Sequence, residues 1–281
     1  MTFYGLLSVL FFFLGNSIID ARARQVQIGY CAELKELDAA HAAGFDYLEL
    51  RTSEIAALSD ADYEKLVEKV NHLKISVPVT YLFIPGSIKL TGPKIDQEQQ
   101  MNYVRKAFDR VARLGTQLIT FGSGVARQVP EGFSKEEAFK QLVEFCQRIG
   151  PEAKARNLTI VIEPQRKQEC NIINSAAEGL KLIEAVNHPN IQLMVDFYHL
   201  AEEKEDPAII IKAKDHIRHL HMANPEGRVF PLKWEEYDYQ RFFENLRRIG
   251  YDQRISIEAG TKDFPKEAPQ AIAFLRRAFS Q

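Results

Sequence analysis

The chain has 281 residues, of which 46% are apolar, and this is enough to bury one large core in one domain. Its 36 basic and 38 acidic residues leave a formal charge of −2, so no net field would recruit nucleic acid or an anionic membrane. The three cysteines have no CxxC or CxxH spacing, which indicates neither a disulfide framework nor a thiolate metal site.

The first 23 residues are set apart by an apolar run at 6–14, which the small-residue site Ala21-Arg22-Ala23 follows. The run is too short to span a bilayer, and such a site is typical of signal-peptide cleavage. We therefore expect residues 1–23 to be a signal peptide and the protein to be exported, periplasmic or extracellular, with no stable membrane span after processing. The lack of Lys or Arg before the run counts against this reading, and without a functional signal the protein would be cytoplasmic.

From residue 24 onward, short apolar runs alternate with longer amphipathic segments, a pattern that predicts parallel strands joined by crossover helices. The eight expected strands lie at 26–30, 47–50, 75–80, 118–122, 158–163, 191–196, 217–221 and 254–258. The expected helices follow them at 34–43, 61–72, 97–114, 135–156, 175–187, 207–216, 239–249 and 267–279. No GxGxxG turn opens the first unit, which favours a closed barrel over an open doubly wound sheet. We expect residues 24–281 to form a single α/β domain, a (β/α)8 TIM barrel.

Local signals support several of these boundaries. Gly44 and Gly115 stand where helices should end, and Ser175 with Glu178 has the spacing of a capping box. The third strand is less regular, because Pro78 has no amide hydrogen to donate to a neighbouring strand. We expect that strand to be short.

The last four expected strands end in Glu163, Asp196, His221 and Glu258. In a barrel of this type the carboxyl ends of the strands converge on one mouth, where the chemistry is found. Three carboxylates crowded there without a cation would raise one another's pKa, so the cluster predicts a bound metal or a shared proton. One imidazole with three carboxylates suits a hard to borderline divalent ion, which leaves Mn²⁺, Co²⁺, Mg²⁺ and Zn²⁺ open. Any one of these acidic residues alone is equally well explained by a pair with a nearby Lys or Arg.

Two further residues compete for a place at this mouth. His219 points to the same face of its strand as His221, but it lies one layer further from the mouth, so we expect His221 to be the ligand. Glu49 ends the second strand, and a structural pair with Arg51 or another base is the simpler interpretation.

At these strand ends the chain resembles the xylose isomerase-like barrels, and within them the ketose 3-epimerases typified by D-tagatose and D-psicose 3-epimerase. The resemblance covers residues 25–281. It is carried by the segments EPQRKQE at 163–169, NIINSAAEG at 171–179, DFYH at 196–199, HLH at 219–221 and IE at 257–258, and by Arg228.

The resemblance implies that the four strand-end residues bind a divalent ion, usually manganese or cobalt, and that Glu163 and Glu258 also act as catalytic bases. It implies substrate-binding roles for Glu169, His199 and Arg228. The segment before Arg228 is one residue longer than in the epimerases, so this side chain could aim differently.

The residue types agree with this chemistry when taken alone. A proton on the carbon beside a ketone leaves only when an electrophile acts on the carbonyl oxygen and a base is in place. A metal supplies the first and Glu163 or Glu258 the second. Return of the proton to the opposite face inverts the centre, and its return to the neighbouring carbon isomerises ketose to aldose. We therefore expect a metal-dependent ketose epimerase or isomerase that works through an enediolate.

Three other functions are weighed against this one. The same site could serve a lyase or dehydratase that acts on an inosose or a 3-keto-glycoside. An abasic-site endonuclease would need more His ligands than seven histidines supply, together with a basic stripe that is absent. A metal-stabilised sugar-binding barrel without turnover is the non-enzymatic reading. In all but the endonuclease reading the partner is a small sugar, and a homo-oligomer is left open.

Overall fold

The structure, a computed structural model, describes residues 25–280, so the expected signal peptide lies outside the described residues. Eight parallel strands form a closed barrel in the order β1-β2-β3-β4-β5-β6-β7-β8. The barrel closes because β1 pairs with β2 on one side and with β8 on the other. This confirms the predicted (β/α)8 barrel in a single domain.

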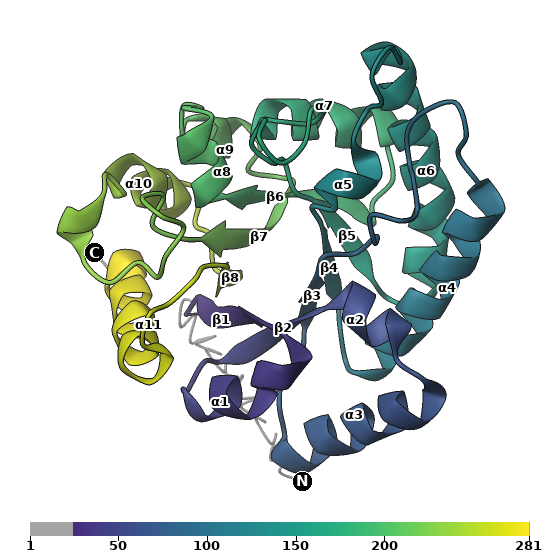
Figure 1. The fold of residues 1–281 in the computed structure, drawn as a ribbon. Helices are drawn as coiled ribbons and strands as arrows, with labels where there is room; N and C mark the ends of the chain where they lie inside the picture. The colour runs from purple at the N-terminus through teal and green to yellow at the C-terminus, as the bar shows by residue number, and fades with distance from the viewer. Residues whose placement is uncertain (1–24, 281) are drawn as a thin grey trace, which may run out of the picture.

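The strands are short, as expected for a barrel whose interior is filled by side chains. Their bounds are β1 Gln27–Ala32, β2 Tyr47–Arg51, β3 Val79–Tyr81, β4 Leu118–Phe121, β5 Thr159–Ile162, β6 Ile191–Asp196, β7 Ile217–Met222 and β8 Arg254–Ile257. In Figure 1 they occupy the centre of the molecule, with helices on the outside.

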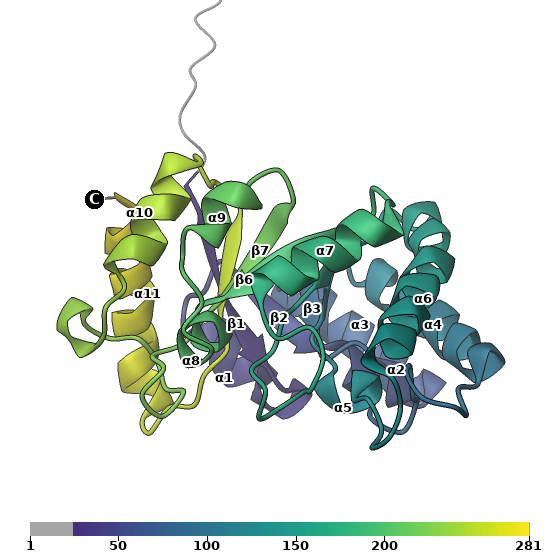
Figure 2. The same cartoon turned by 90° about the horizontal axis from the view of Figure 1, so that it is seen from above.

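The outer layer follows the predicted order. Its elements are η1 Leu34–Glu36 with α1 Leu37–Ala42, α3 Asp60–Leu73, α4 Gln97–Arg113, α6 Lys135–Ala155, α7 Ala176–Val186, α9 Ile209–Lys212, α10 Gln240–Arg248 and α11 Phe264–Ser280. Figure 2 shows α4 and α6 on one side of the barrel and α10 and α11 on the other. No helix among residues 25–280 is long and apolar enough to cross a membrane.

Four short helices were not predicted. They are α2 Thr52–Ala57, α5 Gly124–Arg127, α8 Phe197–Glu202 and η2 Trp234–Glu236. The first three directly follow strands β2, β4 and β6, so they shape the loops at the mouth. Six residues or fewer give no periodic pattern that sequence analysis can detect.

Two elements differ from their predicted bounds by four residues at one end. The third strand covers Val79–Tyr81 instead of 75–80. Pro78 precedes it and contributes only its carbonyl, which accepts from the amides of Gln117 and Leu118 at 2.8 and 3.0 Å. Helix α9 has four residues instead of ten. Three successive isoleucines begin it, and β-branched side chains lower helix propensity.

The helix-end signals are largely confirmed. Gly44 and Gly115 have φ angles of +85° and +86°, the left-handed conformation that ends a helix. The Ser175 hydroxyl caps α7 by accepting from the amide of Glu178. The Glu178 carboxylate accepts from the amide of Asn174 at 2.7 Å instead of from that of Ser175. The serine half of the capping box is therefore present, while the hydrogen bond of the Glu178 carboxylate goes to the residue before Ser175.

The barrel interior changes character along its axis. Tyr47, Val79, Leu118, Val161 and Met194 form an apolar cluster inside the barrel. Because side chains two apart on a strand share a face, the next inward layer is different, and there Glu49, His219 and Ser256 are fully buried. A polar layer thus lies between this apolar cluster and the mouth.

Candidate metal centre and active site

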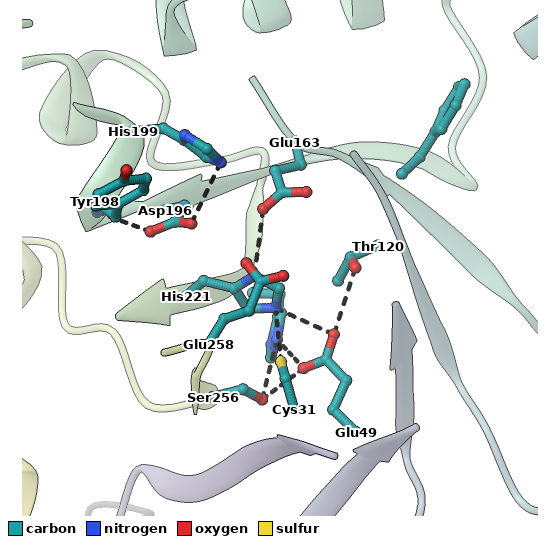
Figure 3. A network of polar contacts seen from close by, with 12 residues as sticks. Cys31, Glu49, Thr120, Glu163, Asp196, Tyr198, His199, His221, Ser256 and Glu258 are labelled. Carbon is teal, nitrogen blue, oxygen red and sulfur yellow. Dashed lines mark hydrogen bonds and ion pairs between the residues drawn. The ribbon is translucent and has the colours of Figure 1, made fainter. Parts of the chain in front are cut away.

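The four predicted ligand residues meet at the mouth of the barrel. Glu163 follows β5, Asp196 ends β6, His221 lies in β7 and Glu258 follows β8. One ligand atom from each lies within 4.8 Å of the others. Nδ1 of His221 lies 3.3 Å from Oε1 of Glu163 and 3.3 Å from Oε2 of Glu258. Neighbouring strands therefore bring together the set that the sequence predicted, as Figure 3 shows.

Three atoms that point into this cluster have no hydrogen-bond partner among residues 25–280. Oε1 of Glu163, Oδ2 of Asp196 and Nδ1 of His221 are all buried and unpaired. Buried polar atoms are normally paired, and several unpaired oxygen and nitrogen atoms that converge form the donor set of a cation. These residues therefore fit a divalent ion, and this part of the cofactor prediction agrees with the geometry.

The pKa values of the carboxyl groups in the metal-free cluster reflect the cost of burying a negative charge. Burial raises the pKa of Asp196 to about 7. Burial, helped by the charge of Glu258, also raises the pKa of Glu163. For Glu258 burial acts in the same direction, but the imidazole of His221, whose Nδ1 lies 3.3 Å away, and the charge of Arg228 outweigh it and bring the pKa to about 2. Burial thus acts alike on all three carboxyl groups, and the nearby cationic groups decide how far each pKa departs from its ordinary value.

His199 presents one hydrogen-bond donor to the mouth. Its Nδ1 accepts from the backbone amide of Arg166 at 3.2 Å, so a neutral ring carries its proton on Nε2. Burial, together with the charge of Arg228, lowers the pKa of His199 to about 3, which keeps the ring neutral at pH 7. Nε2 has no hydrogen-bond partner and lies 3.7 Å from Asp196 and 3.9 Å from Glu169.

Arg228 reaches the site despite the longer segment before it. Its guanidinium donates to Glu258 at 2.8 Å and to Glu169 at 3.2 Å, and it stacks over the ring of Tyr198 at 4.6 Å. The backbone of Arg228 has a φ of +50°, a strained conformation that redirects the side chain. The three predicted substrate-binding residues, Glu169, His199 and Arg228, therefore gather beside the candidate metal ligands.

Comparison with known proteins identifies the family. The family model described as "Xylose isomerase-like TIM barrel" matches residues 37–278. The chain belongs to this family. The resemblance seen at the strand ends is thus confirmed over nearly the whole barrel.

Several relatives in the xylose isomerase-like family carry related names. An L-ribulose 3-epimerase of Methylomonas sp. is 26% identical over 229 residues, which cover 80% of this chain and 77% of the relative. An L-ribulose 3-epimerase of Mesorhizobium japonicum is 25% identical and covers 80% of this chain and 74% of the relative. A solved D-psicose 3-epimerase superposes with a TM-score of 0.80 at 18% identity and covers 91% of this chain and all of that one. The expected isomerase class agrees with these names.

In this member of the xylose isomerase-like family, the loop after β4 supports Glu163. The buried guanidinium of Arg127 donates to the carbonyls of Glu163 and Phe121 at 2.6 and 3.1 Å. Gly122 leaves room for the Glu163 carboxylate, because a Cβ there would collide with Oε2. Sequence analysis missed the role of Arg127. No local signal marks a buried arginine that binds backbone carbonyls.

Glu49 lies inside the barrel, below the ligands. Its Oε2 accepts from Nε2 of His219 at 2.9 Å, and its Oε1 accepts from Nε2 of His221 at 3.1 Å. The expected partner Arg51 lies outside this contact and binds Glu33 at 2.8 Å, so the base that pairs with Glu49 is histidine. His219 lies in the deeper layer, as predicted. The alternation of Leu48-Glu49-Leu50 was the available signal, because it places the carboxylate on the face opposite two core leucines.

A cavity of about 430 Å³ opens beside Glu258 and Arg228, within the range of small-molecule sites. Its other lining residues include Tyr30, Cys31, Glu33, Arg51 and Tyr81. Tyr30 and Tyr81 both lie in the wall of this cavity. Arg51 donates to the hydroxyl of Tyr81 at 2.9 Å, so aromatic and charged groups alternate along the wall, a composition suited to a polyhydroxylated ligand.

Proposed function

We propose that this protein is a divalent-metal-dependent ketose 3-epimerase and that Mn²⁺ is its ion. The observation that carries the proposal is the convergence of one atom each from Glu163, Asp196, His221 and Glu258 within 4.8 Å. The family and the names of the relatives support the reaction class. Three carboxylates and one imidazole support a hard to borderline ion.

In this proposal the ion supplies electrophilic stabilisation for the negative charge that develops on the ketose oxygens. Glu258, which the guanidinium of Arg228 contacts at 2.8 Å, acts as a carboxylate and removes the proton from C3 of the sugar. Glu163, the other carboxyl group that approaches Nδ1 of His221 at 3.3 Å, returns a proton to the opposite face of C3. In the reverse reaction the two carboxyl groups exchange roles.

The neighbouring residues orient the substrate. The unpaired Nε2–H of His199 donates to a sugar oxygen, and Arg228, which donates to Glu258 at 2.8 Å, favours the ionised form of that carboxylate. The far end of the sugar extends into the cavity, where Arg51 and Tyr81 bind its distal hydroxyls. We propose a free sugar as the substrate, since no phosphate-binding motif is evident in the sequence.

The test is deuterium exchange. The protein without residues 1–23 is incubated with Mn²⁺ in deuterated water and a panel of ketoses, among them L-ribulose, D-psicose, D-tagatose and D-fructose, and NMR locates carbon-bound deuterium. We expect deuterium at C3, a product inverted at C3, and loss of both on addition of EDTA. Deuterium at C2 of an aldose product, or at C1 of the recovered ketose, would replace the epimerase by an isomerase, and an eliminated product would favour the lyase.

The variant Glu258→Gln tests the assigned base. It removes the basic oxygen but keeps the shape of the side chain, so we expect sugar binding to persist and exchange at C3 to fall by at least about a hundredfold, the low end for a general base. Glu226→Gln, in the exposed part of the loop after β7, is the matched control and should leave exchange unchanged. Undiminished exchange in Glu258→Gln would reject Glu258 as the base.

A further inference from the structure

A buried polar network lies on the side of the candidate metal ligands that faces the barrel interior. Glu49 is completely buried, and an ionised carboxylate in that position is costly unless its oxygens are paired. Ser256 donates its hydroxyl to Oε2 of Glu49 at 2.5 Å, and the Tyr47 hydroxyl lies 2.8 Å from the same serine oxygen. Figure 3 shows Glu49 and Ser256 on one side of His221, with Glu163 and Asp196 on the other.

The direction of these hydrogen bonds determines where the protons of both imidazoles lie. An ionised carboxylate only accepts hydrogen bonds, so the contacts at 2.9 Å from His219 and at 3.1 Å from His221 both require a proton on Nε2. In a neutral His221 the other nitrogen, Nδ1, then carries a lone pair. Nδ1 is the buried, unpaired atom that lies 3.3 Å from both Glu163 and Glu258.

We propose that Glu49 is a positioning residue for the metal centre. By accepting from Nε2–H, it holds His221 in the tautomer whose Nδ1 lone pair faces the other three ligands, and it fixes the plane of the ring. The proposal rests on the metal-binding role of His221 stated above. It extends that role to a residue on strand β2 that contacts Nε2 of His221, the ring nitrogen that does not face the other three ligands.

No other neighbour can perform this task as well. The Cys31 sulfur lies 3.7 Å from Nε2 of His221, and sulfur is a weak acceptor. Thr120 is the remaining polar neighbour of Glu49, and its hydroxyl donates to Oε1 at 3.4 Å. Thr120 therefore supports the carboxylate and leaves its role as acceptor for His221 intact.

The first test observes the tautomer directly in the unmutated protein. Protein loaded with Zn²⁺, a diamagnetic ion that keeps the bound imidazole neutral, is labelled with ¹⁵N at histidine and examined by long-range ¹H–¹⁵N NMR at neutral pH, with the His221 signals assigned by the loss of peaks in His221→Gln. We expect the Nε2–H tautomer at His221 and at His219. The Nδ1–H tautomer at His221 would overturn the proposal.

The second test measures Mn²⁺ affinity by calorimetry, without sugar. In Glu49→Gln the single amide oxygen cannot accept from Ser256 and both histidines, so we expect binding about 10- to 100-fold weaker, as for other outer partners of metal ligands. His219→Gln disturbs the same buried network but leaves the bond between Glu49 and His221 in place, and it should bind Mn²⁺ within about threefold of the unmutated protein. Equal losses in both variants would assign Glu49 a merely structural role.

These outcomes are independent of the reaction. If the protein binds Mn²⁺ but turns over no ketose, the function proposed above fails while the role of Glu49 stands. If epimerisation is found but Glu49→Gln binds Mn²⁺ with unchanged affinity and His221 keeps its tautomer, the role of Glu49 fails while the function stands.

Discussion

Nη2 of Arg228 lies 2.8 Å from Oε2 of Glu258, while Nη1 of the same guanidinium lies 3.2 Å from Oε1 of Glu169. One arginine thus joins a candidate base to a candidate substrate-binding carboxylate. It does so from a backbone conformation with a φ of +50°, which is uncommon for a residue with a side chain.

Replacement of Arg228 tests this link. Arg228→Met removes a cation that helps to hold the pKa of Glu258 at about 2, so that pKa should rise and the acid limb of the kcat/KM profile should move to higher pH. The lost charge-assisted bond predicts a fall in kcat/KM of about 10- to 100-fold. Arg228→Lys should restore part of the activity because it keeps the charge. An unshifted acid limb in Arg228→Met would show that Arg228 does not influence the base.

Asp196 makes the metal-free protein sensitive to pH. In the folded state burial raises the pKa of Asp196 to about 7 from an ordinary value of 3.8. Between these values the folded protein holds a proton that the unfolded chain has lost, so stability falls as the pH rises from about 4 to about 7 and then levels off. Mn²⁺ should reverse this loss, because it pairs the buried carboxylate.

We therefore expect Asp196→Asn to raise the Tm of the metal-free protein, by an amount that grows between pH 4 and pH 7. The same variant should lose the stabilisation that Mn²⁺ gives to the unmutated protein. Differential scanning calorimetry with EDTA and with Mn²⁺ measures both effects. Asp252→Asn, at an exposed position, is the control. It should leave both the Tm of the metal-free protein and the stabilisation by Mn²⁺ unchanged. A Tm increase that is independent of pH would contradict the assignment to the carboxyl group.

Arg51 is predicted to select the length of the substrate. Its guanidinium borders the cavity and donates to the hydroxyl of Tyr81 at 2.9 Å. In Arg51→Met we expect KM to rise about tenfold for a six-carbon ketose, as for the loss of one charge-assisted hydrogen bond, with a smaller rise for a five-carbon ketose and little change in kcat. Steady-state kinetics on D-psicose and L-ribulose make the comparison. An equal effect on both sugars would remove Arg51 from the distal site.

The N-terminal segment gives a separate prediction. If residues 1–23 act as a signal peptide, the mature protein begins at Arg24 and accumulates outside the cytoplasm. Expression in a Gram-negative host, cell fractionation and N-terminal sequencing test both statements. An intact Met1 in the soluble cell fraction would show that the segment is not processed there.

Much of the architecture follows from patterns that are local in the sequence. Alternating strands and helices predicted the barrel, and the chemical identity of four strand ends predicted the ligand cluster. Both inferences hold because strand ends in a parallel barrel must converge, so Glu163 and Asp196 need no tertiary information to be placed together. The same reasoning ranked His221 above His219, since two residues along a strand is one layer of depth.

The tertiary structure decided what depends on distances across the barrel. Glu49 and His221 are separated by 172 residues, and no periodicity in the sequence indicates that a carboxylate on β2 meets a particular nitrogen of an imidazole on β7. Arg228 contacts Glu258 from a residue whose φ is +50°, which the sequence does not indicate. Arg127 donates to the carbonyl of Glu163 from the segment after β4, and this contact also depends on the tertiary structure. The residue types at the mouth could therefore be identified from the sequence alone. Their orientations and partners arise only when the closed barrel brings opposite strands within hydrogen-bond range.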